Sequence, residues 1–517
     1  MEREMKRHRS YAQTTNDTVQ IIKGGGSDRL SELPKPILDS ILSLLPIKDA
    51  VGTSVLSHNW KHVWTKIPHL TIDLQSVLPK RFPYRNSTKR HERFIYGVNQ
   101  IFIHHKGAIQ RFKLDADFFL CHNALDMWIF LLVDRKIEEL ILCNKRLTKE
   151  SNKVYEVPCL LFNCNTLKLL EIVDCKLKPP PNFKGFSNMR TLKLTHCVLR
   201  DSLVQGILKS PFLETLEICD CKLKPKSNFD GFPRVKTLKL SQCKLTEILI
   251  EGILTKSDCL EFLLIDDCWG FNYILVSLPN LRVLHVKCAV SVHLEKTPKL
   301  GDVLLSPTFL CKEHEDDYRA ALSDSKIFQG DLLHVATLSL GSLIIRVLGS
   351  IGINWYSVGT FENLSKLEVG ILPIEARDRI MVSKLLRASP YLKKLIVGDD
   401  PYKHAIGSYC DEDKYWETQA TCYCLMHHLE TIHISVSRIY PLHRQYDRPG
   451  YDTKISRARP IFDTKFAKFL LVHSRVLKKM RIHMRLLSYH GMEDKDVIRE
   501  DLMQVKWASP HVDLIFP

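Results

Sequence analysis

The feature that most limits what this chain can fold into is a six-residue motif that recurs along most of its length. In the motif, an apolar residue is followed by two variable positions, an apolar residue, one variable position and a third apolar residue. Fourteen copies begin at residues 109, 137, 167, 189, 213, 235, 260, 281, 300, 335, 364, 392, 429 and 477. One such unit cannot bury its apolar side alone, but stacked units form a continuous core. The repetition therefore predicts an elongated solenoid.

Four consecutive copies of the motif continue into a longer pattern. Each is followed, three residues after its last apolar position, by a cysteine and then by a leucine two residues further on; the cysteines are Cys175, Cys197, Cys221 and Cys243. This pattern resembles the leucine-rich repeat, LxxLxLxxCxL. The resemblance implies that each cysteine is a small buried residue standing where other repeats have asparagine. We therefore interpret these thiols as structural rather than catalytic or metal-binding.

An internal duplication sets the length of the repeat. Residues 167–212 and 213–258 align without a gap at a period of 46 residues. DCKLKP at 174–179 recurs at 220–225, NFxGF at 182–186 recurs at 228–232, and GIL at 206–208 recurs at 252–254. Each unit holds two copies of the motif, so the structural repeat is about 23 residues long.

Charged residues occupy the central variable position of three neighbouring motifs. Side chains alternate along a strand, so the leucines point inward and Lys193, Glu217 and Lys239 point outward on the concave side. One interpretation is a substrate-binding row. The other is a row whose alternating charges neutralise one another, and the sequence leaves both open.

The segment 28–75 has a different, helical periodicity. Pro36 suits the first turn of a helix, and the apolar residues behind it recur at helical spacing. Pro46 ends that helix. Asp49 is a candidate N-cap for a second helix, and Ser57 is a candidate N-cap for a third helix that carries two tryptophans. Three short amphipathic helices are therefore expected within about 40 residues.

The same segment resembles the F-box, especially in its plant form. The resemblance rests on LP at 33–34, IL at 41–42, LP at 45–46, VLS at 55–57 and the tryptophans at 60 and 64. It implies binding to a Skp-family adaptor within a cullin–RING ubiquitin ligase. By this analogy the apolar surface that faces or supports the adaptor comes from Leu33, Pro34, Ile37, Leu38, Leu42, Val51, Val55 and Leu56. Trp60 and Trp64 are expected in the core of the motif.

Two positions depart from the F-box pattern. His58-Asn59 stands where the family usually has basic residues, and Gly52 stands where a basic residue is common. Glycine within a helix costs roughly 1 kcal/mol relative to alanine. These departures predict an adaptor affinity below that of typical members.

The C-terminal part resembles the FBD region of plant F-box/leucine-rich-repeat proteins. The resemblance rests on Cys424-Leu425, LETIHI at 429–434 and FAKFLLVHSRVLKKMRI at 466–482. We divide the chain into a flexible leader (1–27), the F-box-like module (28–75), the solenoid (100–424) and an FBD-like region that continues it (425–490). The insert at 435–460 has six basic and two acidic residues. It is a candidate contact loop for an acidic partner, with a disordered surface loop as the alternative.

Composition and charge exclude several classes of protein. With 45% hydrophobic and 26% charged residues, the chain is not globally disordered, and no stretch is apolar enough to predict a membrane span. The N-terminus does not resemble a secretory signal, so we expect reduced thiols and a location in the cytoplasm or nucleus. The CxC pairs at 219/221 and 422/424 lack a second half, which argues against structural zinc.

No catalytic motif is present. The sequence lacks a P-loop, GxGxxG after a strand, HExxH and GxSxG, and we expect neither enzyme activity nor a metal or cofactor. The overall prediction is an α/β fold, in which a short three-helix F-box module precedes an irregular leucine-rich-repeat solenoid with its parallel sheet on the concave face. The predicted function is a substrate-recognition adaptor of a Skp–cullin–F-box ubiquitin ligase that binds an unknown substrate protein. The net charge of +16 leaves open an alternative, a repeat scaffold that binds nucleic acid or acidic partners.

Overall fold

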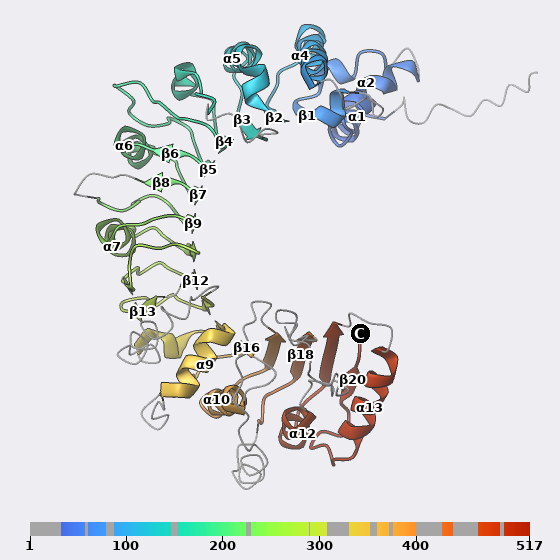
Figure 1. The fold of residues 1–517 in the computed structure, drawn as a ribbon, viewed down its shortest axis with the longest axis vertical. Helices are drawn as coiled ribbons and strands as arrows, with labels where there is room; N and C mark the ends of the chain where they lie inside the picture. The colour runs from blue at the N-terminus through green and yellow to red at the C-terminus, as the bar shows by residue number, and fades with distance from the viewer. Residues whose placement is uncertain are drawn as a thin grey trace, which may run out of the picture.

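The computed structural model describes residues 33–56, 60–78, 87–145, 154–223, 229–288, 290–307, 330–351, 359–371, 376–399, 426–437, 464–485 and 491–517. Within these ranges the chain forms an open arc, with strands along the inner side and helices along the outer side (Figure 1). The predicted leader, Ser57 with its predicted cap, His58-Asn59, the basic insert beyond residue 437, and Cys422 and Cys424 lie outside the described residues.

One parallel sheet of 16 strands runs through the described part of the chain. Its strands, in spatial order, are β1 (His69–Asp73), β2 (Arg111–Ala116), β3 (Glu139–Asn144), β4 (Leu169–Val173), β5 (Thr191–Thr195), β7 (Thr215–Cys219), β9 (Thr237–Ser241), β10 (Phe262–Asp266), β12 (Val283–Lys287), β14 (Asp302–Leu305), β15 (Thr337–Leu340), β16 (Lys366–Ile371), β17 (Lys394–Asp399), β18 (Thr431–Ser437), β19 (Lys479–Arg485) and β20 (Asp513–Ile515). All fourteen sequence motifs form strands of this sheet. The predicted solenoid is confirmed.

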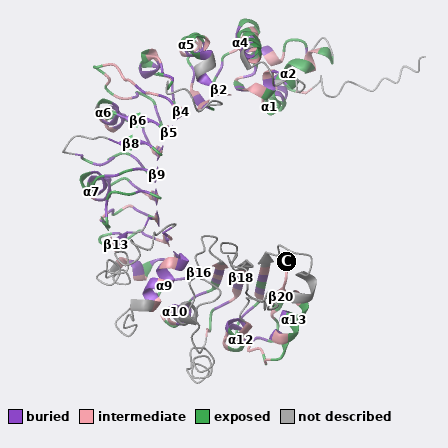
Figure 2. Cartoon of the chain, in the orientation of Figure 1, coloured by how far each residue is buried: buried purple, intermediate pink, exposed green. Residues whose placement is uncertain are grey.

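The inward positions of the motif form the core. Leu192, Leu216, Leu238 and Leu263 occupy the same rung on β5, β7, β9 and β10, and each is at most 1% exposed. The residues between them on each strand are half-exposed on the concave side, as alternation requires. Figure 2 shows the result as a buried strip along the inside of the arc.

The outer side of the arc is irregular. Its helices are α3 (Leu74–Val77), α4 (Ser87–His104), α5 (Phe118–Asp134), α6 (Asp201–Lys209), α7 (Glu247–Lys256), α9 (Ser342–Ile351), α10 (Ala376–Arg387), α12 (Thr464–His473) and α13 (Gly491–Met503), with 3₁₀ turns η3 (Cys159–Asn163) and η4 (Gly330–His334). Two small parallel sheets pair β6 (Val198–Leu199) with β8 (Lys222–Leu223), and β11 (Tyr273–Val276) with β13 (Ser291–Leu294). Among the described helices, none is long and apolar enough to span a membrane.

The prediction that the repeat cysteines are buried and structural is confirmed. They form a row along the solenoid, which we call the cysteine ladder. Cys175, Cys197, Cys221 and Cys243 are each at most 2% exposed, and Cys268 and Cys288, which we did not include, continue the row. The Cys221 thiol donates to the carbonyls of Cys219 (3.2 Å) and of Leu194 (3.4 Å) on the preceding rung. Hydrogen bonding to a neighbouring thiol and burial raise the pKa values of Cys221 and Cys243, so these side chains stay protonated and unreactive.

The turn that leads into each ladder cysteine has a left-handed backbone. The residue before the cysteine has a positive φ in five successive repeats, namely Asp174, His196, Asp220, Gln242 and Asp267. Asp tolerates this region better than most side chains. The turn lets the chain leave the sheet and direct the thiol back to the rung behind it.

The duplicated residues contact one another within each unit. The Phe183 ring packs on Gly206, where any Cβ would overlap it, and the Ser210 hydroxyl accepts a hydrogen bond from the Phe186 amide (3.0 Å). In the second unit the Ser257 hydroxyl accepts from the Phe232 amide at 2.9 Å. The repeated residues thus make equivalent contacts in the two units, and these contacts join a convex helix to the turn before it.

The N-terminal module has a small core of its own. It consists of α1 (Lys35–Ser43), α2 (Ile47–Gly52), η1 (Thr53–Val55) and η2 (Trp64–Lys66). Its buried residues are Leu38, Leu42, Ala50, Trp60 and Ile67. Trp60 is 5% exposed, as predicted for the core, and Trp64 packs against both this cluster and the solenoid core.

Two details of the predicted module were wrong. Asp49 does not cap α2, because Pro46 holds that position and Asp49 lies in the first turn. The third helix is not an α-helix. Residues 60–63 form turns and only a 3₁₀ turn follows, because the chain at Ile67 is already extended toward the first strand.

The module and the solenoid are joined without a linker. β1 starts at His69, inside the segment that we assigned to the module, and pairs along its whole length with β2. The Thr65 carbonyl accepts hydrogen bonds from the amides of Lys106 (2.8 Å) and Gly107 (3.1 Å). IPHLTI at 67–72 matches the repeat motif, so the sequence contained a signal for this strand that we missed.

A buried histidine connects the N-terminal module to the solenoid. His105 is 2% exposed, and its Nε2 donates to the Ile67 carbonyl at 2.9 Å, while no described residue lies within hydrogen-bonding geometry of Nδ1. Burial lowers the pKa of His105 below its ordinary value of 6.5; the hydrogen bond to Ile67 opposes this and the charge of Arg135 adds to it. The folded protein therefore holds His105 neutral.

We expect the free energy of unfolding to decrease as the pH falls below 6.5. The unfolded chain has the ordinary pKa and takes up the proton first, so the contribution of His105 is complete above 6.5 and is lost as the pH falls through the lower folded pKa. Urea unfolding at about pH 7.5 and about pH 5.5 measures the effect. His105→Asn keeps a donor for Ile67 without the titration, so it should lose less stability over this interval. An equal loss in both proteins would show that His105 is not responsible.

Candidate partner-binding surfaces

The N-terminal module carries an exposed apolar surface, which we call the docking patch. It comprises Ile37, Ile41, Leu44, Leu45, Val51, Val55 and Leu56. Leu44 is 87% exposed, Val55 88% and Leu56 65%. Isolated exposed apolar residues are ordinary, but seven within 20 residues of one small module are typical of a protein-interaction surface.

Helical geometry explains why α1 has two apolar faces. Leu38 and Leu42, four residues apart, point into the module core, whereas Ile37 and Ile41 form a second stripe that points outward. Pro34 caps the start of this helix, and Pro46 caps the start of α2. The prolines thus fix where each helix begins and place Leu44 and Leu45 in the exposed turn between them.

The predicted adaptor residues fall into two groups in the structure. Pro34, Ile37, Val51, Val55 and Leu56 are exposed, Leu33 is half-buried, and Leu38 and Leu42 are buried beneath them as support. The contact of these residues with an adaptor stays a prediction. The list of predicted residues omitted Ile41, Leu44 and Leu45, although Ile41 and Leu45 continue the helical stripe that the sequence showed.

The second candidate surface is the concave face of the sheet. Glu217 lies between Lys193 and Lys239, with Nζ–O distances of 3.2 Å and 2.9 Å. Burial raises the pKa of Glu217, but the hydrogen bonds from Lys239 and Lys193 outweigh this and hold the pKa below its usual value. The geometry matches the self-neutralising interpretation of this row. Substrate contact by these three residues stays a prediction.

An apolar section follows this charged row on the concave face. Phe262 and Leu264 of β10, Val283 of β12 and Leu304 of β14 are half-exposed there. The Lys239 ammonium lies 6.0 Å from the centroid of the Phe262 ring, and the His285 ring meets Phe262 edge-on at 5.5 Å. The variable positions of LEFLLI at 260–265 contain this signal, which we did not use. Apolar side chains on a concave sheet suit a protein partner.

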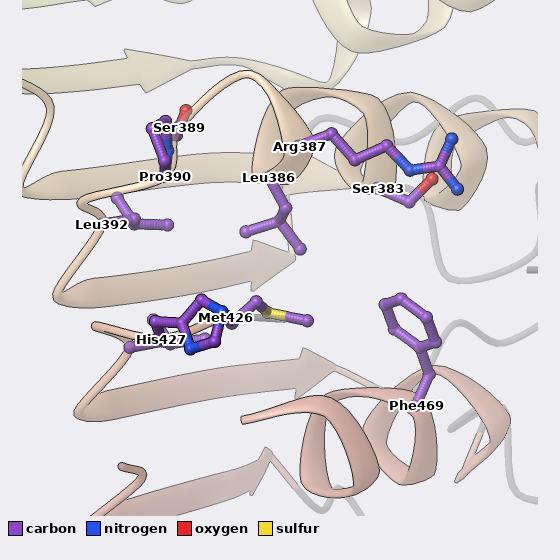
Figure 3. A pocket seen from close by; sticks show the side chains of 10 residues that line it. Ser383, Leu386, Arg387, Ser389, Pro390, Leu392, Met426, His427 and Phe469 are labelled. Carbon is purple, nitrogen blue, oxygen red and sulfur yellow. The ribbon is translucent and has the colours of Figure 1, made fainter. Parts of the chain in front are cut away.

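A cavity of about 240 Å³ lies on the helical side, between α10 and α12. Figure 3 shows Leu386 and Arg387 of α10, Met426 and His427 before β18, and Phe469 of α12 around it. Its described lining contains no carboxylate and no thiol, so it offers no acid–base pair. Nor does the described part of the chain bring together a group of side chains suited to a metal ion.

Comparison with known proteins identifies both parts. Residues 30–70 match the F-box domain, and residues 125–228 and 213–397 match the LRR repeats of the FBD-associated F-box protein At5g56370. The repeat matches together span 125–397, more than half of the chain. The chain belongs to the plant F-box/LRR-repeat family. Both of its modules are protein-interaction modules, as we predicted from the sequence.

Relatives of the F-box/LRR chain also carry the FBD region. The F-box/FBD/LRR-repeat protein At1g13570 of Arabidopsis thaliana is 27% identical over 510 residues, which cover 95% of this chain and 99% of the relative. The putative FBD-associated F-box protein At5g56560 of Arabidopsis thaliana is 26% identical over 424 residues, 78% of this chain and 84% of the relative. The predicted FBD-like region is supported. In the structure it continues the sheet through β18 and β19 to β20, beyond residue 490.

Proposed function

We propose that this protein is a substrate-recognition adaptor of a Skp–cullin–F-box ubiquitin ligase. In this proposal the docking patch binds a Skp-family adaptor, the concave face binds a substrate protein, and the chemistry belongs to other subunits in the cytoplasm or nucleus. The docking patch carries the proposal, because seven apolar side chains stay exposed on a module that has a separate buried core. Burying them against a partner removes that surface from water.

The mechanism that we propose is proximity. A bound substrate is held near the ubiquitin-conjugating enzyme, which raises the effective concentration of its lysines. This role needs two separate binding surfaces on one chain, and it needs no catalytic residue. The module at one end of the arc and the long concave sheet suit this division (Figure 1).

Co-expression of the full chain with a Skp-family adaptor tests the proposal. We expect the two proteins to co-elute as a complex in size-exclusion chromatography. The folded state of the chain is checked independently by circular dichroism. A folded chain that elutes apart from the adaptor would overturn the proposed function, and Gly52 with His58-Asn59 would then be the first positions to restore toward the family pattern.

A further inference from the structure

Basic side chains gather on the concave face near the C-terminal end of the arc. We call this set the basic patch; it consists of Lys366 (β16), Lys394 (β17), His433 (β18), Lys479, Arg481 and His483 (β19). Lys366, Lys394, Thr431 and Lys479 share one rung, and Glu368, Ile396, His433 and Arg481 share the next. All of these residues are half-exposed or exposed.

The basic patch differs from the upstream concave face in how its charges are paired. Upstream, Glu217 pairs with two lysines and Asp266 lies 3.7 Å from Lys287. In the patch, Lys366 pairs with Glu368 at 3.2 Å. Among the described residues, no carboxylate lies within ion-pair distance of Lys394, Lys479 or Arg481. Lys394 of β17, and Lys479 and Arg481 of β19, lie on the two strands that flank β18 and have no ion-pair partner among the described residues.

His433, at the centre of the basic patch, is affected by the same positive charges. Burial lowers the pKa of His433, and His483, Arg481 and Lys394 lower it further, with Glu368 acting in the opposite direction. A negatively charged group placed here would relieve this repulsion. The positive charges around His433 therefore favour the binding of an anion.

A glycine keeps part of this surface low. Gly398 of β17 lies at the next outward position and pairs with Gly370 of β16, where a Cβ would lie 2.8 Å from the Ser342 backbone nitrogen. A Cβ at Gly398 would meet nothing closer than the Val369 carbonyl at 4.0 Å, so the surface there is open. The adjacent Ile396 adds an aliphatic contact beside the cations. A peptide with an acidic side chain next to an apolar one could contact the basic side chains and Ile396 together.

We propose that the basic patch binds an acidic, extended segment of a substrate protein. This rests on the proposed function, because it names the class of substrate segment that the concave face takes. The patch spans four strands, roughly 14 Å across at the ordinary strand spacing, which about five extended residues cover. Glu368 lies within the patch, and Asp513 of β20 lies next to Lys479 in register. An unbroken row of phosphates would have to pass these carboxylates, whereas a peptide that alternates acidic with uncharged residues can place its charges beside Lys394 and Arg481.

The test uses the full chain, bound to its adaptor where that complex forms, and a fluorescein-labelled peptide of about ten residues that alternates glutamate with serine. A glutamine–serine peptide of equal length is the ligand control. We compare the wild type with Lys394→Glu/Arg481→Glu. The matched control is Lys209→Glu/Lys222→Glu, which makes the same change of charge at exposed positions on the outer side. Fluorescence anisotropy gives each affinity.

We expect the acidic peptide to bind, and the patch variant to weaken it by about tenfold or more, while the control variant changes it less than about twofold. Equal binding of the two peptides, or equal loss in the two variants, would overturn the proposal. Tighter binding of single-stranded DNA that the patch variant also abolishes would assign the patch to nucleic acid instead. Loss of adaptor binding alone would affect the proposed function and leave the peptide result standing.

Discussion

Replacing Leu44 and Val55 with aspartate is expected to lower the affinity for a Skp-family adaptor by about 100-fold or more. Both side chains are almost fully exposed, at 87% and 88%, so each loses the burial it would gain in the complex. That burial is worth about 1.5–3 kcal/mol per aliphatic side chain, and each aspartate would also have to leave water. Biolayer interferometry with immobilised adaptor measures the change.

Because neither residue packs in the core, the same double variant should unfold at the same urea concentration as the wild type. The matched control is Ile248→Asp, which makes an equivalent change on the exposed face of α7, 52% exposed, and should leave adaptor affinity intact. Leu42→Ala makes the opposite comparison, because that side chain is 1% exposed and its loss should destabilise the module. Unchanged affinity of the Leu44/Val55 variant would move the adaptor contact off the docking patch.

Gly231→Ala is expected to destabilise the solenoid by about 2–4 kcal/mol. Gly231 has φ of +68°, a conformation that alanine adopts with strain. Its new Cβ would lie 2.6 Å from the Gly252 carbonyl oxygen and 2.9 Å from the Lys256 carbonyl carbon, both of which belong to backbone. The convex helix α7 would therefore have to move away from the preceding turn. Urea unfolding monitored by circular dichroism measures the loss.

The same substitution at Gly52 provides the matched control. Gly52 lies in α2 with nothing within 4 Å of the position of a Cβ. Gly52→Ala should therefore stabilise the protein by up to about 1 kcal/mol, the ordinary preference of a helix for alanine. If the two glycine variants shifted stability equally, the close approach of Gly231 to α7 would not be what requires glycine there.

The sheet was predictable because its determinants repeat locally. Alternation of apolar and polar residues within six positions decides which side chains face the core, and fourteen copies made the pattern unambiguous. The buried cysteines followed from the same register. At the joint, by contrast, Asp49 and the third helix were mispredicted because the chain turns early to enter the sheet at His69.

The binding surfaces were less predictable than the fold. Outward positions tolerate many residues, so their roles depend on which rungs become neighbours. Glu217 accepts from both flanking lysines only because β5, β7 and β9 stack in register, at sequence separations that vary along the chain. The basic patch likewise joins residues 366 to 483, which inserts separate in the sequence.

The direct continuation of the N-terminal module into the sheet has a geometric consequence. β1 is hydrogen-bonded to β2, and His105 and Thr65 join the two parts, so the described residues at this joint provide no pivot. In the proposed role, a bound substrate would therefore be held at a fixed position relative to the adaptor. The distance from the N-terminal module to a bound substrate is then set by the number of strands between them, at about 4.8 Å per strand. A duplication like that of residues 167–258 would lengthen the solenoid by two strands. In the proposed role, it would change which substrate lysines lie near the ubiquitin-conjugating enzyme.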